Sequence, residues 1–133
     1  MTYTTSFSIE FTKNLPGFPK LDQLKIAYFQ TTFENVGLGN FSQYRGKIGP
    51  SWKGLFHTDP KYTFAHGNDL WHYHVGIPVY TPSPFGPYST SDWQLHFIWP
   101  DWKNNGPHIH VVDLLQHNHY SGPFNLPLPT ALP

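Results

Sequence analysis

The stretch LWHYHVGI, residues 70–77, constrains the fold most strongly because its polar and apolar side chains alternate. In a β-strand, successive side chains point to opposite faces of the sheet. One face of this strand would therefore be apolar, and the other would carry His72 and His74. The apolar set is Trp71, Tyr73, Val75 and Ile77. The pattern predicts a strand with its apolar face in the core and its histidine face available for chemistry.

Two later stretches repeat this division. Residues 93–99 (WQLHFIW) place His96 opposite an apolar set, and residues 107–115 (PHIHVVDLL) place His108 and His110 opposite Ile109. Strict alternation assigns Asp113 to the face away from those histidines. If the three strands are neighbours, about 4.8 Å apart, their histidines lie about 5 to 10 Å from one another on one surface. A lone histidine in a strand is usually packed or solvated, but several in phase suit an active site or a metal site.

The remaining segments predict a small α+β fold. Residues 20–36 have apolar side chains at helical spacing, with Asp22 in the first turn and Gly37 just past the end, and predict a helix. Residues 6–11 alternate as a first strand would, whereas residues 37–54, 57–68 and 80–92 predict loops and turns. We expect an antiparallel sheet of about four strands, with this N-terminal helix packed on one face and the histidine face open.

Length and composition set further bounds. A chain of 133 residues suits a single domain, 1–133, with a proline-rich tail over about residues 120–133. The lack of cysteine excludes disulfides and thiolate metal sites. We find neither a secretory signal pattern nor a stretch near the roughly 20 apolar residues that span a bilayer. We therefore expect a soluble protein with no membrane partner, in the cytoplasm by default.

The charges are unevenly placed, although the net charge is zero. Residues 44–66 contain one acidic side chain, Asp59, and four basic ones. The basic side chains are Arg45, Lys47, Lys53 and Lys61. This segment predicts a modest basic patch just before the histidine strand. We interpret Asp59 itself as a turn or cap residue.

One interpretation of these features is RNA cleavage by attack of a 2′-hydroxyl on the adjacent phosphate. Imidazole, with a pKa of about 6.5, can remove the hydroxyl proton and protonate the leaving 5′-oxygen near neutral pH. Basic side chains would bind the phosphate, and aromatic side chains would stack on bases. This chemistry requires no metal or other cofactor.

Other interpretations use the same residues. The H-x-H pairs at positions 72/74, 108/110 and 117/119 could ligate zinc or iron, because alternate strand positions point the same way. The alternation, however, places no carboxylate in phase with them. A third possibility is a noncatalytic binding module, since 18% of the residues are aromatic. The residues alone leave these possibilities open.

The order of the residues resembles a known family. The run FSQYRGKIGPSWKGLFHTDPKY, residues 41–62, followed by LWHYHV, resembles the YafO-like toxins of the RelE/ParE superfamily. The later segments QLHFIW and IHVVDLLQHNH also resemble these toxins, with His119 after the last strand. The earlier matching positions are Phe41, Tyr44, Arg45, Pro50, Phe56, Asp59, Tyr62, His72 and His74.

This resemblance implies a RelE-like fold and a type II toxin, an endoribonuclease (mRNA interferase) that cuts mRNA, in characterised relatives on the ribosome, and so inhibits translation. It also implies a cognate antitoxin as partner. The expected catalytic residues are His119, His72 and His74 from the family positions, and His96 and His110 from strand phase alone. The expected phosphate-binding residues are Arg45, Lys61, Lys53 and Lys47.

Overall fold

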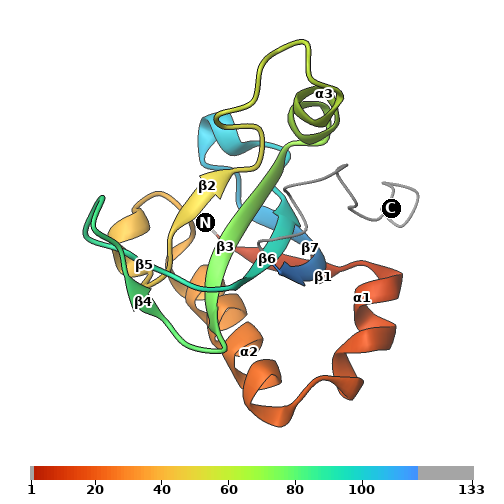
Figure 1. Ribbon diagram of the computed structural model, residues 1–133. Coiled ribbons are helices and arrows are strands. Elements are labelled where there is room, and N and C mark those ends of the chain that lie inside the picture. The colour runs from red at the N-terminus through yellow and green to blue at the C-terminus, as the bar shows by residue number, and fades with distance from the viewer. Residues whose placement is uncertain (1, 117–133) are drawn as a thin grey trace.

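The computed structural model describes residues 2–116, in which a single mixed sheet forms the centre of the molecule (Figure 1). Within these residues the sheet has five strands in the order β1-β7-β6-β3-β2. The strands are β1 (Thr4–Phe7), β2 (Ile48–Pro50), β3 (Leu70–Ile77), β6 (Trp93–Ile98) and β7 (His108–Gln116). All neighbours are antiparallel except β1 and β7, which run parallel. The predicted α+β class is confirmed, with one strand more than expected.

Two short strands form a separate hairpin beside the sheet. They are β4 (Thr81–Pro82) and β5 (Ser89–Thr90). The predicted loop at 80–92 is therefore an ordered β-hairpin, and we call residues 81–90 the hairpin from here on. It lies beside β3, below β2 in the view of Figure 1.

Helix α2 (Lys20–Val36) has the predicted bounds and covers one face of the sheet (Figure 1). Its buried side chains are Ile26, Phe29 and Phe33. The Phe29 ring stacks on Tyr73 of β3, with ring centroids 4.5 Å apart. The helix ends at Gly37, whose φ of 66° is a left-handed conformation that favours glycine. The apolar spacing of residues 20–36 suggests that these side chains all face the core, but this is partly wrong, because Leu21, Leu24 and Tyr28 are exposed.

Two other α-helices occupy segments that we expected to be a strand and turns. Helix α1 (Ile9–Asn14) begins after Ser8, whose side chain accepts a hydrogen bond from the Phe11 backbone N–H. Helix α3 (Pro60–Gly67) begins after Asp59, whose side chain accepts from the Lys61 N–H. Such caps satisfy backbone donors that a helix start leaves unpaired. The predicted strand over residues 6–11 therefore ends at Phe7, and Asp59 is confirmed as a cap residue.

Three short 3₁₀ helices complete the described elements. They are η1 (Leu15–Gly17), η2 (Phe41–Gln43) and η3 (Trp102–Asn104). Within the described part of the chain, no helix combines the length and the apolar character that crossing a membrane requires.

A bulge in β7 changes which side chains share a face. Val111 is paired with Phe97 and Asp113 with His96, so Val112 is an extra residue in the ladder. Past this point Leu114 faces the core with its partner Leu95. The alternation argument therefore placed Asp113 wrongly, since the bulge brings it to the same face as His96.

The core has two parts on opposite faces of the sheet. The larger part lies between α2 and the sheet and includes Phe29, Tyr73 and Phe97. A smaller cluster on the histidine face joins Ala65 of α3 to Leu70 and Val112. Helix α3 thus covers one end of the histidine face, which is less open than predicted.

Candidate functional site

Three histidines from two neighbouring strands meet on the face of the sheet opposite α2. His72 of β3 is directly paired with His96 of β6, and their ring centroids lie 6.0 Å apart. The His74 ring lies 5.8 Å from the His72 ring. The predicted convergence of imidazoles from separate strands is confirmed for this group.

The three histidine side chains differ in how far solvent or a ligand can reach them. His72 is half-buried, whereas His74 is 6% exposed and His96 is 0% exposed. Burial, with smaller effects from His72 and His74, lowers the pKa of His96 well below its usual 6.5. His96 is therefore neutral at neutral pH and out of reach of a ligand. The expectation of an open face is wrong for His74 and His96.

His74 is held by hydrogen bonds at both ring nitrogens. The Ser91 backbone N–H donates to Nδ1 over 3.0 Å, and Nε2 lies 3.1 Å from the Gln94 side-chain amide nitrogen. Nδ1 also lies 3.1 Å from the Ser91 carbonyl oxygen, and the Gln94 amide N–H donates to Nε2, so both ring nitrogens have a partner. These contacts join the end of the hairpin to the sheet and fix the orientation of His74.

A cavity of about 410 Å³, which we call the histidine pocket, opens beside this group. His72 and His74 form part of its wall, and Lys47 and Asp92 add charges of both signs. The complete lining is Lys47, His72, His74, Ser83, Phe85, Tyr88, Thr90, Ser91, Asp92 and Gln94. The pocket thus combines imidazole, ammonium and carboxylate groups with two aromatic rings from the hairpin.

His72 is the histidine of this pocket best placed for proton transfer. Its Nδ1 lies 3.0 Å from the Ser51 hydroxyl, which orients the ring. Its half-buried side chain lines the pocket, unlike that of the fully buried His96. Lys47 also lines the pocket, and its Nζ lies 5.5 Å from the centroid of the Tyr88 ring.

His110 belongs to a separate group at the β1–β7 edge. Its Nδ1 lies 2.6 Å from the Ser6 hydroxyl, which is also 2.9 Å from Nε2 of His108. The His108 Nδ1 lies 2.7 Å from the Thr4 hydroxyl, so four side chains form one hydrogen-bonded row. Burial, followed by the effect of His108, lowers the pKa of His110. His110 does not line the histidine pocket.

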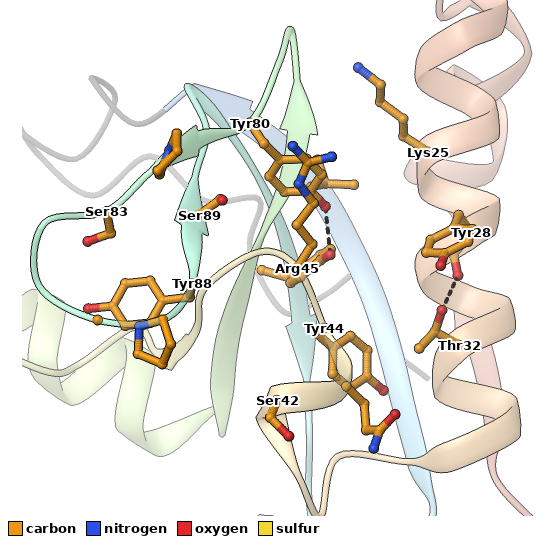
Figure 2. A pocket seen from close by; sticks show the side chains of 16 residues that line it. Lys25, Tyr28, Thr32, Ser42, Tyr44, Arg45, Tyr80, Ser83, Tyr88 and Ser89 are labelled. Carbon is orange, nitrogen blue, oxygen red and sulfur yellow. Dashed lines mark hydrogen bonds between the residues drawn. The ribbon is translucent and has the colours of Figure 1, made fainter.

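The predicted phosphate-binding residues are spread over several places. Arg45 lines a different pocket, between α2 and the hairpin (Figure 2). Lys53 and Lys47 both line a third pocket of about 440 Å³, while Lys61 lies in the first turn of α3. His119, the remaining predicted catalytic residue, lies outside the described residues.

Several pocket residues were not singled out from the sequence. Gln94 is in phase with His96 along β6, and that spacing could have identified it. Phe85, Tyr88 and Asp92 come from the segment expected to be a loop, where no periodicity indicates which side chains face the site. Only the ordered hairpin brings these residues to the histidines.

The metal-site alternative depends on which carboxylates reach the histidines. The β7 bulge places Asp113 opposite His96, although the sequence predicted the other face. Oδ1 of Asp113 accepts a hydrogen bond from the Leu114 N–H over 2.8 Å. Among residues 2–116, no three histidine, aspartate or glutamate side chains are grouped closely enough to hold a metal ion.

A comparison with solved structures found a chain of similar fold. No family model matches the chain, and no curated protein matches it significantly in sequence. A chain in the crystal structure of the archaeal RelE–RelB complex from Pyrococcus horikoshii OT3 is similar with a TM-score of 0.45 and 14% sequence identity. The similarity covers 87% of this chain and 96% of that one.

Proposed function

We propose that this chain is the toxin of a type II toxin–antitoxin system and acts as an endoribonuclease on mRNA. The histidine pocket carries the proposal, because it joins a half-buried imidazole to a lysine and two aromatic rings. The motif resemblance to YafO-like toxins supports the same function, since two of its positions, His72 and His74, line this pocket. In this proposal residues 1–133 form a single RelE-like toxin domain.

The proposed reaction is an attack of a ribose 2′-hydroxyl on the adjacent phosphorus. The 2′-oxygen–phosphorus bond forms and the bond from phosphorus to the 5′-oxygen breaks, which leaves a 2′,3′-cyclic phosphate and a 5′-hydroxyl. His72 accepts the proton of the 2′-hydroxyl. A second histidine donates a proton to the leaving 5′-oxygen, and the predicted residue for this role remains His119.

The other pocket residues assist this reaction. Lys47 binds the nonbridging phosphate oxygens and stabilises the charge that develops on them. Tyr88 and Phe85 offer ring faces to the bases on either side of the scissile bond, as is usual for single-stranded RNA. Phe85 is 88% exposed, which suits a side chain that a bound strand would cover.

The buried histidines act through His72. His96 lies against it and is neutral because burial lowers its pKa, so it does not oppose the protonation of His72 during the reaction. His74 holds the hairpin against the sheet through Ser91. Both are therefore proposed as positioning residues. His110 faces the β1–β7 edge, and a catalytic role for it stays a prediction.

The partners follow from the same proposal. The substrate is mRNA, cut on the ribosome in the family that the sequence resembles, and a cognate antitoxin binds the toxin and blocks it. The compartment is the cytoplasm, where translation takes place. No metal or other cofactor takes part in the proposed chemistry.

The direct test is cleavage of a defined mRNA by the purified full chain, with and without ribosomes and with and without EDTA. We expect cleavage that EDTA leaves intact and products with 2′,3′-cyclic phosphate ends. His72→Ala should lower the rate about 10²- to 10⁴-fold, as expected for loss of a general acid or base. The matched control is His57→Ala, because His57 is exposed and lies outside the pocket.

Three outcomes would contradict the proposal. Unchanged cleavage by His72→Ala would refute the mechanism while leaving a nuclease function standing. Stoichiometric metal in the protein, with loss of activity in EDTA, would favour the metalloenzyme. Binding of RNA without cleavage or growth arrest would favour the noncatalytic binding module.

A further inference from the structure

A second cavity, of about 690 Å³, lies between α2 and the hairpin (Figure 2). We call it the arginine pocket, after Arg45 in its wall. Helix α2 contributes Lys25, Tyr28 and Thr32. The other lining residues are Ser42, Gln43, Tyr44, Arg45, Tyr73, Val75, Tyr80, Pro82, Ser83, Gly86, Pro87, Tyr88 and Ser89. The cavity is thus large enough for a small organic ligand and has a wall rich in hydroxyl groups and tyrosine rings.

The charge of this pocket is positive. Its lining contains Arg45 and Lys25 but neither aspartate nor glutamate. Nζ of Lys25 donates hydrogen bonds of 2.7 Å to the carbonyl oxygens of Gly76 and Pro78, so this ammonium group is already well bound. Arg45 forms no ion pair with an acidic side chain of residues 2–116. Its guanidinium is therefore the group that would attract an anion.

The tyrosines of the pocket do not offset this charge. Burial raises the pKa values of Tyr44, Tyr73 and Tyr80, so their phenols remain protonated and neutral. The hydroxyl groups of Tyr73 and Tyr80 lie 2.7 Å apart and share a hydrogen bond. The pocket thus presents a fixed cation among neutral hydroxyl groups.

Aromatic surface is the second feature of the pocket. The Arg45 guanidinium carbon lies 4.6 Å from the centroid of the Tyr80 ring, which holds the arginine beside the cavity. Tyr28 faces the cavity from α2 on the opposite side (Figure 2) and is 73% exposed. An exposed ring opposite a held guanidinium suits a ligand that has both a planar aromatic group and an anionic group.

The backbone holds Arg45 in this place. The Ser89 N–H donates to the Arg45 carbonyl over 2.9 Å, and the Lys47 N–H donates to the Ser89 carbonyl over 2.8 Å. The His74 N–H donates in turn to the Lys47 carbonyl over 2.9 Å. Residues 45–47 therefore lie between the hairpin and β3 and position Arg45 and Lys47 for two different pockets.

The arginine pocket and the histidine pocket share part of their walls. Ser83 and Tyr88 of the hairpin line both cavities. The two cavities therefore adjoin at the hairpin. A polymer with a planar group and an anion in every unit matches both cavities.

We infer that the arginine pocket binds a second nucleotide of the RNA strand whose scissile phosphate occupies the histidine pocket. The base stacks on the Tyr28 ring, and Arg45 binds the phosphate. This inference rests on the proposed ribonuclease function and adds a separate binding site to it. An acidic protein segment fits less well, because a carboxylate needs the arginine but makes no use of the exposed ring.

The test is binding of fluorescent 2′-O-methyl oligoribonucleotides to the full chain, measured by anisotropy. The methyl group blocks attack by the 2′-oxygen, so binding is measured without cleavage. Arg45→Gln should weaken binding of an octamer at least tenfold, and Tyr28→Ser at least fivefold. The matched control Lys20→Gln removes an exposed charge from α2 outside the pocket and should change binding less than twofold.

A second measurement separates this site from the catalytic one. A dinucleotide such as UpA fills only the histidine pocket, so Arg45→Gln and Tyr28→Ser should cleave it at the parent rate. With long RNA the same variants should raise KM and leave kcat nearly unchanged. His72→Ala should instead lower kcat for both substrates.

The outcomes distinguish the two proposals. If the parent binds the octamer and neither variant weakens binding, the inference is overturned, whatever the cleavage assay shows. Binding that depends on Arg45 and Tyr28 in a protein that does not cleave RNA supports the nucleotide site and refutes the nuclease. If a polyglutamate peptide competes with the octamer and Tyr28→Ser has no effect, the pocket binds an acidic protein segment and the inference is wrong. Tyr28 is so exposed that Tyr28→Ser provides the test even if Arg45→Gln fails to fold.

Discussion

At the scale of single residues, the degree of burial determines which of the three histidines can take part in a reaction. Strand phase brings His72, His74 and His96 to one face, but only His72 combines partial exposure with a place in the pocket wall. His74 is held at both nitrogens, and His96 is wholly enclosed. A row of equivalent catalytic groups, as the sequence suggested, thus becomes one reactive group supported by two others.

The enclosed state of His96 predicts a pH-dependent stability. Its pKa is lowered in the folded protein, so the unfolded chain binds more protons as the pH falls below about 6.5. The stability is fully present above that pH and is lost toward acid, at up to about 1.4 kcal/mol per pH unit for this residue. Urea unfolding between pH 7.5 and 5.5 should show this slope, with a smaller effect in the same direction from His110.

The variant His96→Gln isolates the contribution of this residue. It should flatten the dependence of the unfolding free energy on pH, even if it lowers stability at every pH. His57→Gln, at an exposed position, should leave the slope as in the parent. If the unfolding free energy of His96→Gln depends on pH as steeply as that of the parent, folding does not lower the pKa of His96, and this prediction is wrong.

At the scale of elements, local pattern predicted much of the fold. The bounds of α2 and the three histidine strands follow from periodicity, since a helix or strand that packs on one face repeats its apolar side chains regularly. The sequence DP at residues 59–60 is a helix-start signal, and Ser8 is another. The prediction used neither signal, because residues 6–11 alternate like a strand and residues 57–68 resemble turns, so α1 and α3 were not predicted.

The bulge at Val112 and the placement of the hairpin could not be derived in this way. A bulge depends on how β7 pairs with β6, and alternation along one strand carries no information about its partner. The position of Asp113 was therefore wrong. The histidines and Lys47 of the site were predictable from spacing and charge, whereas Tyr88 and Phe85 reach it only through tertiary contacts of the hairpin.

The segment that joins the hairpin to β3 depends on a glycine. A Cβ added at Gly46 would lie 1.8 Å from the His74 carbonyl oxygen and 2.8 Å from the Tyr73 ring. A backbone oxygen cannot move aside cheaply, so Gly46→Ala should lower the free energy of unfolding by about 1 to 3 kcal/mol or more. It should also weaken oligonucleotide binding, because Arg45 and Lys47 flank this position.

The comparison for this variant is Gly17→Ala, where nothing lies within 4 Å of the added Cβ. We expect a change within about 0.5 kcal/mol at that open position. Urea unfolding of the two variants beside the parent provides the measurement. A Gly46→Ala protein as stable as Gly17→Ala would mean that the segment does not pack against β3 as described.

At the scale of the whole molecule, a net charge of zero limits how the protein can bind RNA. Long-range attraction by the entire surface is absent, so binding depends on the few cations held at the pockets. Arg45 lines the arginine pocket and Lys47 the histidine pocket, and Lys53 shares a third pocket with Lys47. The pockets around the hairpin thus offer two or three separate positions at which a cationic side chain can bind a phosphate.

This arrangement predicts a shallow salt dependence. For single-stranded nucleic acid the slope of log K against log salt concentration is about −0.7 for each phosphate neutralised, so two or three contacts give about −1.4 to −2.1. Anisotropy titrations of the 2′-O-methyl octamer from about 50 to 300 mM salt measure it. Arg45→Gln should reduce the slope by about 0.7, whereas Lys20→Gln should leave it unchanged. A slope steeper than about −4, or one that Arg45→Gln does not alter, would place the RNA on a broader basic surface than these pockets provide.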